Sequence, residues 1–354
     1  TDTSVFIEHS TIQPVDGNLR KLHPGGAVAV RSVTVRAFAK LNLGLKILGR
    51  RADGFHELRT VYQTISLADQ LQISVGGKGQ PDAIRLVVQG LDVPAGAENL
   101  AVRAATAMLH ALGWKRQVSI QLRKRVPTGG GLGGGSSDAA AVLRGLDLLS
   151  DYRLDRRELF RLAASLGSDV PFFLLGGRAI GVGRGEEIYP LPDMPLLHCV
   201  VALPDAGMNT AEAYGLLGAA PWPTAAQGKR QEKATGQPLP AADIFVGAQL
   251  AELATAEGLF QSPIPNDFEP ILFQRFPMLS RARNTLLRGG AKWAALTGSG
   301  SAIFGMFPSR AQAAAAQRKL DATGMRLFLC RTVRRRDYQA GCAQSNLHTR
   351  LHSR

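Results

Sequence analysis

A glycine-rich segment in the middle of the chain, residues 127–137, constrains the fold more than any other stretch. It reads Pro-Thr-Gly-Gly-Gly-Leu-Gly-Gly-Gly-Ser-Ser. Glycine adopts positive φ angles and lets the backbone approach a ligand closely, so such a run can turn several N–H groups toward one anion. Apolar residues then recur at helical spacing, and Ser136 and Ser137 are residue types that favour helix N-caps. Because helix N-termini favour anions, the sequence predicts a phosphate-binding loop that opens a helix.

Several interpretations of this loop remain open from the residues alone. A Walker-type loop ends in Gly-Lys-Ser/Thr, and no lysine is present in the segment. Gly129, Gly131 and Gly134 fit the dinucleotide-binding pattern, but the acidic residue which that pattern requires would be Asp155, beyond a helix and a loop. The alternatives are a glycine turn without a ligand and a nucleotide-phosphate loop of another type.

Alternation of apolar and other residues predicts a strand over residues 33–46. Lys40 and Asn42 share its second face with Arg36. Residues two apart in a strand lie about 6.6 Å apart on the same side, so Lys40 and Asn42 can reach one bound group together. A solvent-exposed polar face is the other interpretation of this pattern.

Periodicity and turn residues predict further elements around these two. Residues 60–75 are expected to form two strands that join near Asp69, and Asn99 is expected to cap the next helix. An alanine-rich helix at residues 311–320 and a last strand at residues 325–330 indicate a second domain. The fold class predicted from these elements is α+β.

A candidate acidic residue follows the next predicted helix. That helix covers residues 154–166 and is expected to end at Gly167. Asp169 then precedes Pro171, so its carboxylate is a candidate cap for a short helix with proline in its first turn.

Length, apolar runs and cysteines indicate the general class of protein to which this chain belongs. With 354 residues and 45% hydrophobic content, the chain can bury the cores of two domains. No apolar run reaches the length of a membrane span, and the first 30 residues lack the hydrophobic core of a signal peptide. Three widely separated cysteines without metal spacing predict free thiols in a reducing, cytoplasmic compartment: Cys199, Cys330 and Cys342.

The net charge of +14 raises the question of a nucleic-acid partner. The charge is dispersed, and no aromatic-rich basic motif accompanies it. We therefore expect no nucleic-acid partner and no membrane partner. Nucleic-acid binding through the arginine-rich residues after Cys330 is the alternative, and it would be sensitive to salt.

Three separated motifs resemble those of the GHMP kinases, a family that phosphorylates small-molecule hydroxyls with ATP. Pro-x3-Gly-Leu-Gly-x-Gly-Ser-Ser-x-Ala-Ala, from Pro127, resembles the central motif of this family. Ala-Lys-Leu-Asn-Leu at residues 39–43 resembles the first motif, and the Gly-Ser turn at residues 296–305 resembles the third, which packs beneath the phosphate loop. The resemblance covers roughly residues 33–333. It implies the two-domain α+β GHMP-kinase fold, with the active site in the cleft between the domains.

The same resemblance implies catalytic and ATP-binding roles. Lys40 would stabilise developing charge, and Asp169, in Gly-Ser-Asp-Val-Pro-Phe, would orient the hydroxyl and accept its proton. ATP would come with Mg²⁺, for which the sequence assigns no ligand. The implied ATP-binding residues are Asn99, Lys124 beside the purine, Pro127, Gly129, Gly130, Gly131, Leu132, Gly133, Gly134, Gly135, Ser136 and Ser137.

A fourth segment indicates the substrate. Arg-Ala-Asp-Gly-Phe-His, at residues 51–56, resembles the segment with which the GHMP kinases of 4-diphosphocytidyl-2-C-methyl-D-erythritol hold the cytosine. An aromatic ring can stack on a pyrimidine, and a histidine can present one donor and one acceptor to its edge. Many members have tyrosine where this chain has phenylalanine, so any contact of that hydroxyl is lost. The implied substrate-binding residues are Asn42, Phe55, His56 and Tyr214.

The activity implied is ATP-dependent phosphorylation of the 2-hydroxyl of this cytidine diphosphate substrate, in the non-mevalonate isoprenoid pathway. Two alternatives remain. The first is a GHMP kinase for another small alcohol, such as mevalonate or homoserine, neither of which requires the Phe-His pair. The second is a non-catalytic nucleotide-binding regulator, which the presence of both Lys40 and Asp169 disfavours.

The expected domain organisation has four parts. An N-terminal extension covers residues 1–31, an ATP-binding domain residues 32–190, a C-terminal domain residues 191–333, and a solvated basic tail residues 334–354. A Pro- and Gln-rich stretch at residues 221–240 is predicted to be an exposed loop. The expected assembly is a monomer or a homodimer.

Overall fold

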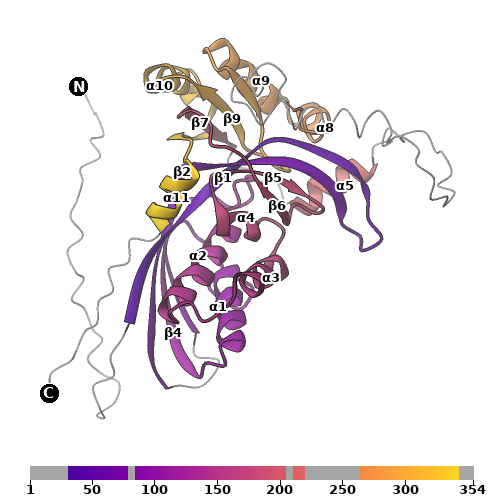
Figure 1. The fold of residues 1–354 in the computed structure, drawn as a ribbon. Coiled ribbons are helices and arrows are strands. Elements are labelled where there is room, and N and C mark those ends of the chain that lie inside the picture. Colours follow the sequence, from indigo (N-terminus) through magenta and orange to yellow (C-terminus); the bar gives the residue numbers. More distant parts are fainter. Residues whose placement is uncertain (1–30, 79–83, 205–209, 220–263, 343–354) are drawn as a thin grey trace, which may run out of the picture.

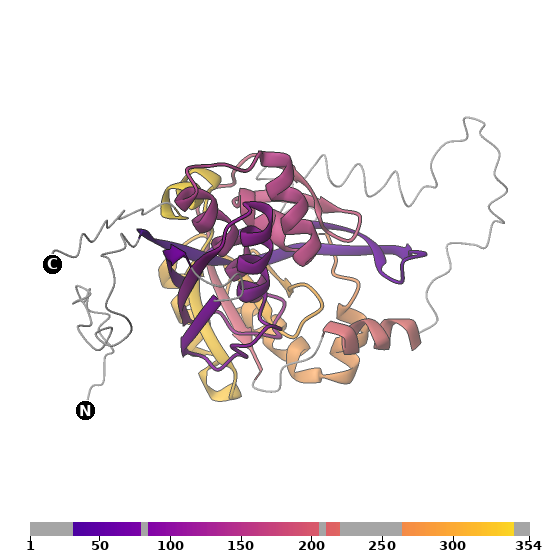
Figure 2. The same cartoon turned by 90° about the horizontal axis from the view of Figure 1, so that it is seen from below.

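Two β-sheets with helices packed on them make up the part of the chain that the computed structural model describes, namely residues 31–78, 84–204, 210–219 and 264–342. Figure 1 shows the long β1–β2 pair arching between the helices α1 to α4 and the second sheet. In the view from below, the same pair runs across the whole molecule (Figure 2). The two sheets therefore meet along these strands.

The first sheet has the strand order β3-β4-β2-β5-β6, and β1 pairs with β2. All of its pairs are antiparallel except β3 with β4. The helices α1, α2 and α4 contact its strands, and α3 packs on these three helices. The elements are β1 (Arg31–Arg50), β2 (His56–Lys78), β3 (Ile84–Gly90), α1 (Leu100–Ala111), β4 (Arg116–Lys124), α2 (Gly134–Leu149), α3 (Arg156–Leu166), α4 (Val170–Leu175), β5 (Arg178–Val182) and β6 (Glu187–Pro190).

The second sheet is antiparallel throughout, with the order β10-β7-β9-β8. A core cluster joins it to the first sheet, because Leu41 of the first sheet shares that cluster with Val201 and Phe304 of the second. The elements are β7 (His198–Leu203), α5 (Thr210–Ala219), α8 (Glu269–Arg275), α9 (Pro277–Arg288), β8 (Trp293–Leu296), β9 (Ile303–Phe307), α10 (Arg310–Arg318), η1 (Asp321–Thr323) and β10 (Arg326–Arg331).

The predicted strand at residues 33–46 is confirmed as part of β1, but every residue from Ala37 to Leu45 is buried, so both faces are covered there. Val33, Val35 and Ala37 pack with the helices, but Ala39, Leu41 and Leu43 pack in the core between the two sheets. A register shift between Phe38 and Lys40 separates the two sets, so the predicted single apolar face is correct only up to Ala37. Lys40 and Asn42, which follow this register shift, are only 3% and 2% exposed. The solvent-face interpretation of these two residues is therefore wrong.

Residues 60–75 do not form two strands. They belong to the single continuous strand β2, and Asp69 lies buried within it. Its carboxylate accepts hydrogen bonds from the backbone N–H groups of Arg125, at 2.5 Å, and Val126, at 2.8 Å. An aspartate that typically marks a turn is instead satisfied inside the sheet, so the strand continues through this position.

The helix after the glycine loop begins earlier than the serine caps predict. Its N-cap is Gly133 in the left-handed region, and the helix starts at Gly134. Ser136 and Ser137 therefore lie in its first turn. Other predicted ends are confirmed: the Asn99 side chain accepts the N–H of Ala101 at 2.9 Å, and α3 ends at its C-cap Gly167.

The segment after residue 334 is not solvated throughout. Arg335–Cys342 forms helix α11, which returns to the first sheet and packs on β1. Its Tyr338 is buried, with the ring 5.3 Å from that of Phe38 and the hydroxyl donating to the carbonyl of Phe173. The high arginine content of the segment led to the prediction of a solvated tail, although Tyr338 attaches the segment to the core. Residues 1–30, 221–240 and 343–354, for which an extension, a loop and the end of the tail were predicted, lie outside the described residues.

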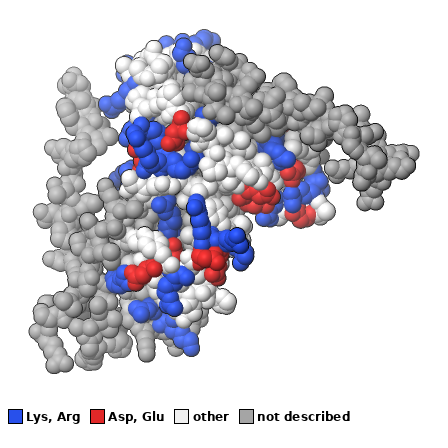
Figure 3. Space-filling view, in the orientation of Figure 1, with Lys and Arg blue, Asp and Glu red and all other residues white. Residues whose placement is uncertain are grey.

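Charges on the surface are dispersed, as the sequence suggests. On the face shown in Figure 3, lysine and arginine side chains form several separate groups, many beside acidic residues. All three cysteines are buried free thiols. Within the described ranges, no helix has the length and apolar character needed to cross a membrane.

Candidate active site

A cavity of about 1010 Å³ lies where the two sheets meet. Its walls come from β1, β2, the glycine loop, the first turn of α2, the start of α4, the turn between β5 and β6, and the second domain. The lining includes Lys40, Asn42, Phe55, His56, Tyr62, Pro127, Gly129, Gly131, Leu132, Gly133, Gly134, Gly135, Ser136, Asp169, Arg184, Tyr214, Gly298 and Ser299.

The glycine loop adopts a backbone that few other residues could follow. Gly129, Gly131 and Gly133 have φ angles of 73°, 73° and 71°. The loop is attached to β1 because the N–H of Lys40 donates to the carbonyl of Leu132 at 3.0 Å. Its glycines line the cavity without side chains, so backbone N–H groups can approach phosphate oxygens there.

The third motif packs directly beneath this loop. A Cβ on Gly131 would lie 2.2 Å from the carbonyl oxygen of Thr297, so a side chain does not fit. The N–H of Ala302 donates to the carbonyl of Gly130 at 3.3 Å. Asn266 supports the turn from the other side, since its Nδ2 donates to the carbonyl of Gly298 at 2.8 Å.

Gly131→Ala is expected to lower the free energy of unfolding by about 2–3 kcal/mol, because it adds a steric overlap to the cost of a left-handed alanine. The KM for ATP should rise, because the loop must shift. Gly113 is the matched control, since its φ is 62° and a Cβ added to it would meet no atom within 4 Å. Gly113→Ala should lose less stability, about 1–2 kcal/mol, and keep the KM for ATP. Equal losses in urea unfolding of the two variants would contradict the proposed packing.

Lys40 and Asp169 form an ion pair at the cavity wall. The Nζ of Lys40 lies 3.3 Å from Oδ2 of Asp169 and also contacts Oδ1 of Asn42. Asp169 occupies the N-cap position of α4 but makes no side-chain capping bond, so its carboxylate faces the lysine instead. The Lys40 side chain is 4% exposed and that of Asp169 is 29% exposed. The carboxylate can therefore be reached from the cavity, while the lysine is buried and contacts Asn42 and Asp169.

Asn42 is fixed by three neighbours. Its Nδ2 donates to Oγ1 of Thr60 at 2.8 Å, and its N–H donates to Oγ1 of Thr297 at 2.9 Å. With its amide nitrogen and oxygen both engaged, Asn42 chiefly orients the Lys40 ammonium in this structure. The spacing of two residues in β1 thus brings both side chains to one place, as the sequence predicts.

An aromatic group lies at the other end of the cavity. The rings of His56 and Tyr214 stack with centroids 4.7 Å apart, and Tyr214 also packs edge-on against Phe268 at 4.9 Å. Phe55 is 52% exposed, and the guanidinium of Arg184 lies 4.9 Å from its ring centroid. Burial, followed by the charge of Asp169, raises the pKa of Tyr214 to about 12.

Family models and curated relatives match this chain. The model described as GHMP kinases N terminal domain matches residues 99–177, and that described as GHMP kinases C terminal matches residues 246–325. A 4-diphosphocytidyl-2-C-methyl-D-erythritol kinase of Solibacter usitatus is 43% identical over 284 residues, which are 79% of this chain and 83% of the relative. One of Moorella thermoacetica is 38% identical over 85% of this chain and 99% of the relative. The chain belongs to the 4-diphosphocytidyl-2-C-methyl-D-erythritol kinase family of GHMP kinases.

Solved structures agree with this family assignment. A crystal structure of a 4-(cytidine 5'-diphospho)-2C-methyl-D-erythritol kinase matches at a TM-score of 0.63 and 38% identity, over 84% of this chain and 98% of that one. A homoserine kinase of Cytophaga hutchinsonii matches at a TM-score of 0.64 but only 18% identity, over 85% of this chain and 94% of that one. The second match shows the shared GHMP-kinase fold alone.

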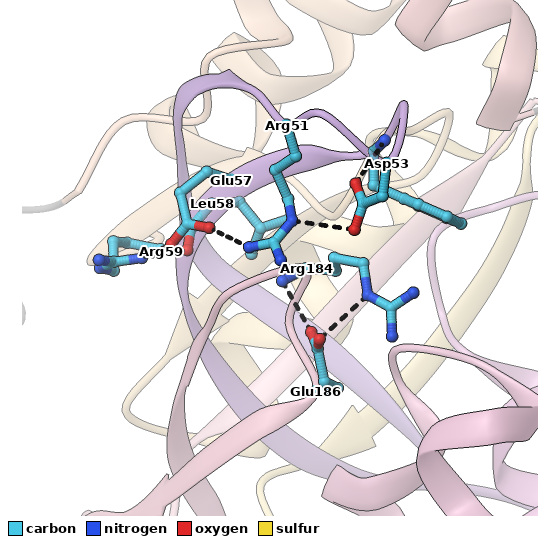
Figure 4. Close-up of polar contacts among 8 residues, drawn as sticks. Arg51, Asp53, Glu57, Leu58, Arg59, Arg184 and Glu186 are labelled. Carbon is cyan, nitrogen blue, oxygen red and sulfur yellow. Dashed lines mark hydrogen bonds and ion pairs between the residues drawn. The ribbon is translucent and has the colours of Figure 1, made fainter. Parts of the chain in front are cut away.

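The loop that carries Phe55 in this family member is held by a chain of ion pairs (Figure 4). Arg51 bridges Asp53, with Nε 3.2 Å from Oδ2, and Glu57, with Nη1 2.6 Å from Oε2. The N–H of Phe55 donates to Oδ1 of Asp53 at 3.1 Å. Beside this loop, Glu186 holds Arg184 at 3.0 Å between Oε1 and Nε. The Asp-Gly turn and its flanking charges thus present the Phe55 ring to the cavity.

Some residues implied by the family resemblance lie outside the cavity lining. Lys124 is buried beneath the loop, with Nζ 2.6 Å from both Asp69 and Asp138, and not beside open space for a purine. Ser137 is also buried, and its hydroxyl donates to the carbonyl of Phe38 at 2.7 Å. Both side chains hold the loop in place from behind. Gly130 is packed away from the cavity as well, and Asn99 borders it only through its neighbour Leu100.

Tyr62 and Arg184 are among the lining residues that sequence reasoning missed. Tyr62 lies in the middle of a buried strand, where an aromatic residue is ordinarily core. Arg184 was overlooked because it stands in a glycine-rich turn. In the described part of the chain, no group of three His, Cys, Asp or Glu side chains could hold a metal ion.

Proposed function

We propose that this chain transfers the γ-phosphoryl group of ATP to the 2-hydroxyl of 4-diphosphocytidyl-2-C-methyl-D-erythritol. One observation carries the proposal: the glycine loop, the Lys40–Asp169 pair and the Phe55–His56–Tyr214 group line one cavity. A glycine loop at a helix N-terminus suits phosphates, and an aromatic group suits a pyrimidine. The ion pair lies where a hydroxyl between these two sites could react.

Each part of the site has one task in this reaction. The backbone of the glycine loop and the N-terminus of α2 bind the phosphates of ATP, with Mg²⁺ neutralising part of their charge. The Lys40 ammonium stabilises charge on the transferred group. Asp169 accepts the hydrogen bond of the acceptor hydroxyl and then its proton. Because the transition state of phosphoryl transfer is loose, orientation of the hydroxyl is the larger part of this task.

The substrate end of the cavity distinguishes this function from the alternatives. Mevalonate and homoserine carry no base that could stack on Phe55 or pair with His56. ADP release should be measured with ATP and Mg²⁺ in the presence of the cytidylated alcohol, methylerythritol phosphate, mevalonate or homoserine. We expect turnover with the cytidylated alcohol alone. Turnover with only an uncytidylated alcohol would remove the substrate assignment, and no turnover with any of the four alcohols would favour a regulator.

The buried free thiols fit a reducing compartment such as the cytoplasm.

The pH dependence of substrate binding should follow His56. Burial, and secondarily the charge of Arg50, lowers its pKa from 6.5, so the imidazole is neutral at pH 7 and offers one donor and one acceptor. We expect the KM for the cytidylated substrate to be constant above pH 7 and to rise as the pH falls below 6.5, when protonation removes the acceptor.

The control for this prediction is His56→Gln, whose amide presents a donor and an acceptor without titrating. Its KM should not change over the same pH range, and the KM for ATP should not follow His56 in either protein. An equally steep rise in His56→Gln would show that another group is responsible.

A further inference from the structure

We infer that Tyr62 is a positioning residue that orients the carboxylate of Asp169 toward the acceptor hydroxyl. This inference rests on the proposed function. Tyr62 lies on β2 directly opposite Asn42 of β1, and its hydroxyl reaches Oδ1 of Asp169 at 3.0 Å. The two residues are 107 positions apart in the sequence, and the fold alone brings them together.

Both oxygens of Asp169 are held by one donor each. Lys40 contacts Oδ2 at 3.3 Å, and Tyr62 donates to Oδ1. A rotation of the carboxylate about its Cβ–Cγ bond would break both contacts. Each carboxylate oxygen can accept a second hydrogen bond. The pair of donors thus fixes the plane of the carboxylate and leaves acceptor capacity for the substrate hydroxyl.

The hydroxyl of Tyr62 also lies 3.3 Å from the carbonyl oxygen of Gly185. A phenol has one proton to donate, so these two acceptors compete for it. A hydrogen bond to a carboxylate is the stronger of the two, and the distance to Asp169 is the shorter. Asp169 is therefore the main acceptor.

The structure provides a close-fitting pocket for the Tyr62 ring. A Cβ on Gly181 would lie 2.5 Å from Cε2 of Tyr62, and one on Gly185 would lie 2.5 Å from its hydroxyl oxygen. The ring of Phe172, in the helix that follows Asp169, stacks on Tyr62 with centroids 4.8 Å apart. Two glycines and one aromatic ring thus leave the phenol little freedom to move, so its hydroxyl stays beside the carboxylate.

The phenol remains a donor over the whole working pH range. Burial first, and then the charge of Asp169, raise the pKa of Tyr62 well above its ordinary value of 10. A neutral phenol beside a carboxylate is a charge-assisted donor. Tyr62 therefore orients Asp169 without competing with it for the substrate's proton.

Tyr62→Phe tests this inference, because it removes the hydroxyl and keeps the ring. We expect kcat to fall by about 10- to 100-fold, the value of one hydrogen bond to a charged group, with the KM of both substrates unchanged. Tyr189→Phe is the matched control, since that tyrosine is 55% exposed on β6, and it should leave kcat unchanged. An unchanged kcat in Tyr62→Phe, or an equal fall in both variants, would overturn the inference.

Unfolding in urea gives a second readout that does not need turnover. Tyr62→Phe should lower the midpoint urea concentration more in the wild-type background than in the Asp169→Ala background. Only the wild-type background contains the hydrogen bond between the Tyr62 hydroxyl and the Asp169 carboxylate, which this substitution removes. Equal shifts in the two backgrounds would show that the residues are not coupled and would overturn the inference. A wild type that is inactive with the cytidylated alcohol would instead remove the proposed function, and the unfolding comparison would still decide whether the hydroxyl holds the carboxylate.

Discussion

Asp169→Asn is expected to lower kcat by about 10²- to 10⁴-fold, the range for loss of a general base, with little change in the KM for ATP. The amide keeps the size of the carboxylate but cannot accept the proton of the substrate hydroxyl. It also loses the ion pair with Lys40, which then faces the cavity without its partner. Steady-state kinetics with the cytidylated alcohol measure both constants.

Asp151→Asn is the matched control for this substitution. The Asp151 side chain is 73% exposed, pairs with Arg31 far from the cavity, and has a φ of 60°, a conformation that asparagine tolerates equally well. Its kcat should equal that of the wild type. A loss of less than about ten-fold in Asp169→Asn would mean that proton acceptance by this carboxylate is not needed for the reaction.

Lys124→Met is expected to destabilise the fold by about 3–5 kcal/mol, because it leaves buried charges without their partner. The ammonium lies between Asp69 and Asp138, at 2.6 Å from each, and its side chain is 1% exposed. Burial alone would lower the pKa of Lys124, but the two carboxylates outweigh burial and raise it. The stabilisation from this lysine is therefore present at neutral pH and is lost only in strong alkali, above its ordinary pKa of 10.5.

The loss in Lys124→Met should depend on pH in a defined direction. Burial, despite the opposing charge of Lys124, raises the pKa of Asp138 well above 3.8. Without the ammonium, protonation of this carboxyl becomes more favourable in the folded state, so the destabilisation should shrink as the pH falls from 7. Lys115→Met changes an exposed lysine just after α1 and should cost little at any pH. Urea unfolding at pH 5 and pH 7 measures both variants, and a loss below about 1 kcal/mol at pH 7 would contradict a structural role of the buried lysine.

Lys124, just before the glycine loop, is a residue whose place in the site could not be predicted from the sequence. Lys124 stands three residues before Pro127, and the family resemblance implied a contact with the purine of ATP. Its partners Asp69 and Asp138 are 55 and 14 residues away in the chain. Periodicity shows which face of a strand a residue shares, but not which distant carboxylate closes over it. The sequence therefore predicted that Lys124 lies near the glycine loop, but not that Lys124 is buried beneath the loop.

Local patterns were more informative where neighbours in the sequence are also neighbours in space. The spacing of Lys40 and Asn42 in one strand predicted that both side chains would meet, and they do. The glycine loop and the helix after it were predicted together because a single local turn builds both. The helix start was wrong by three to four residues, because Gly133 in a left-handed conformation takes the place of a serine cap.

Contacts between remote segments escaped prediction. Tyr62 and Asp169 come from a strand and a helix start that pair only in the folded chain, and the ring of Tyr62 looks like ordinary core in the sequence. Helix α11 was also missed, because its arginines suggest a solvated tail while only Tyr338 and Cys342 are buried. In both places the deciding partner lies more than one hundred residues away.

The most direct test of the central claim is the position of the transferred phosphate. The wild-type protein should be incubated with ATP, Mg²⁺ and 4-diphosphocytidyl-2-C-methyl-D-erythritol, and the product analysed by phosphorus NMR alongside ADP release. We predict one new phosphomonoester on the 2-hydroxyl for each ADP formed, with the diphosphate bridge intact. ADP release without a phosphorylated substrate, or a phosphate on another hydroxyl, would contradict the arrangement of loop, ion pair and aromatic group described above.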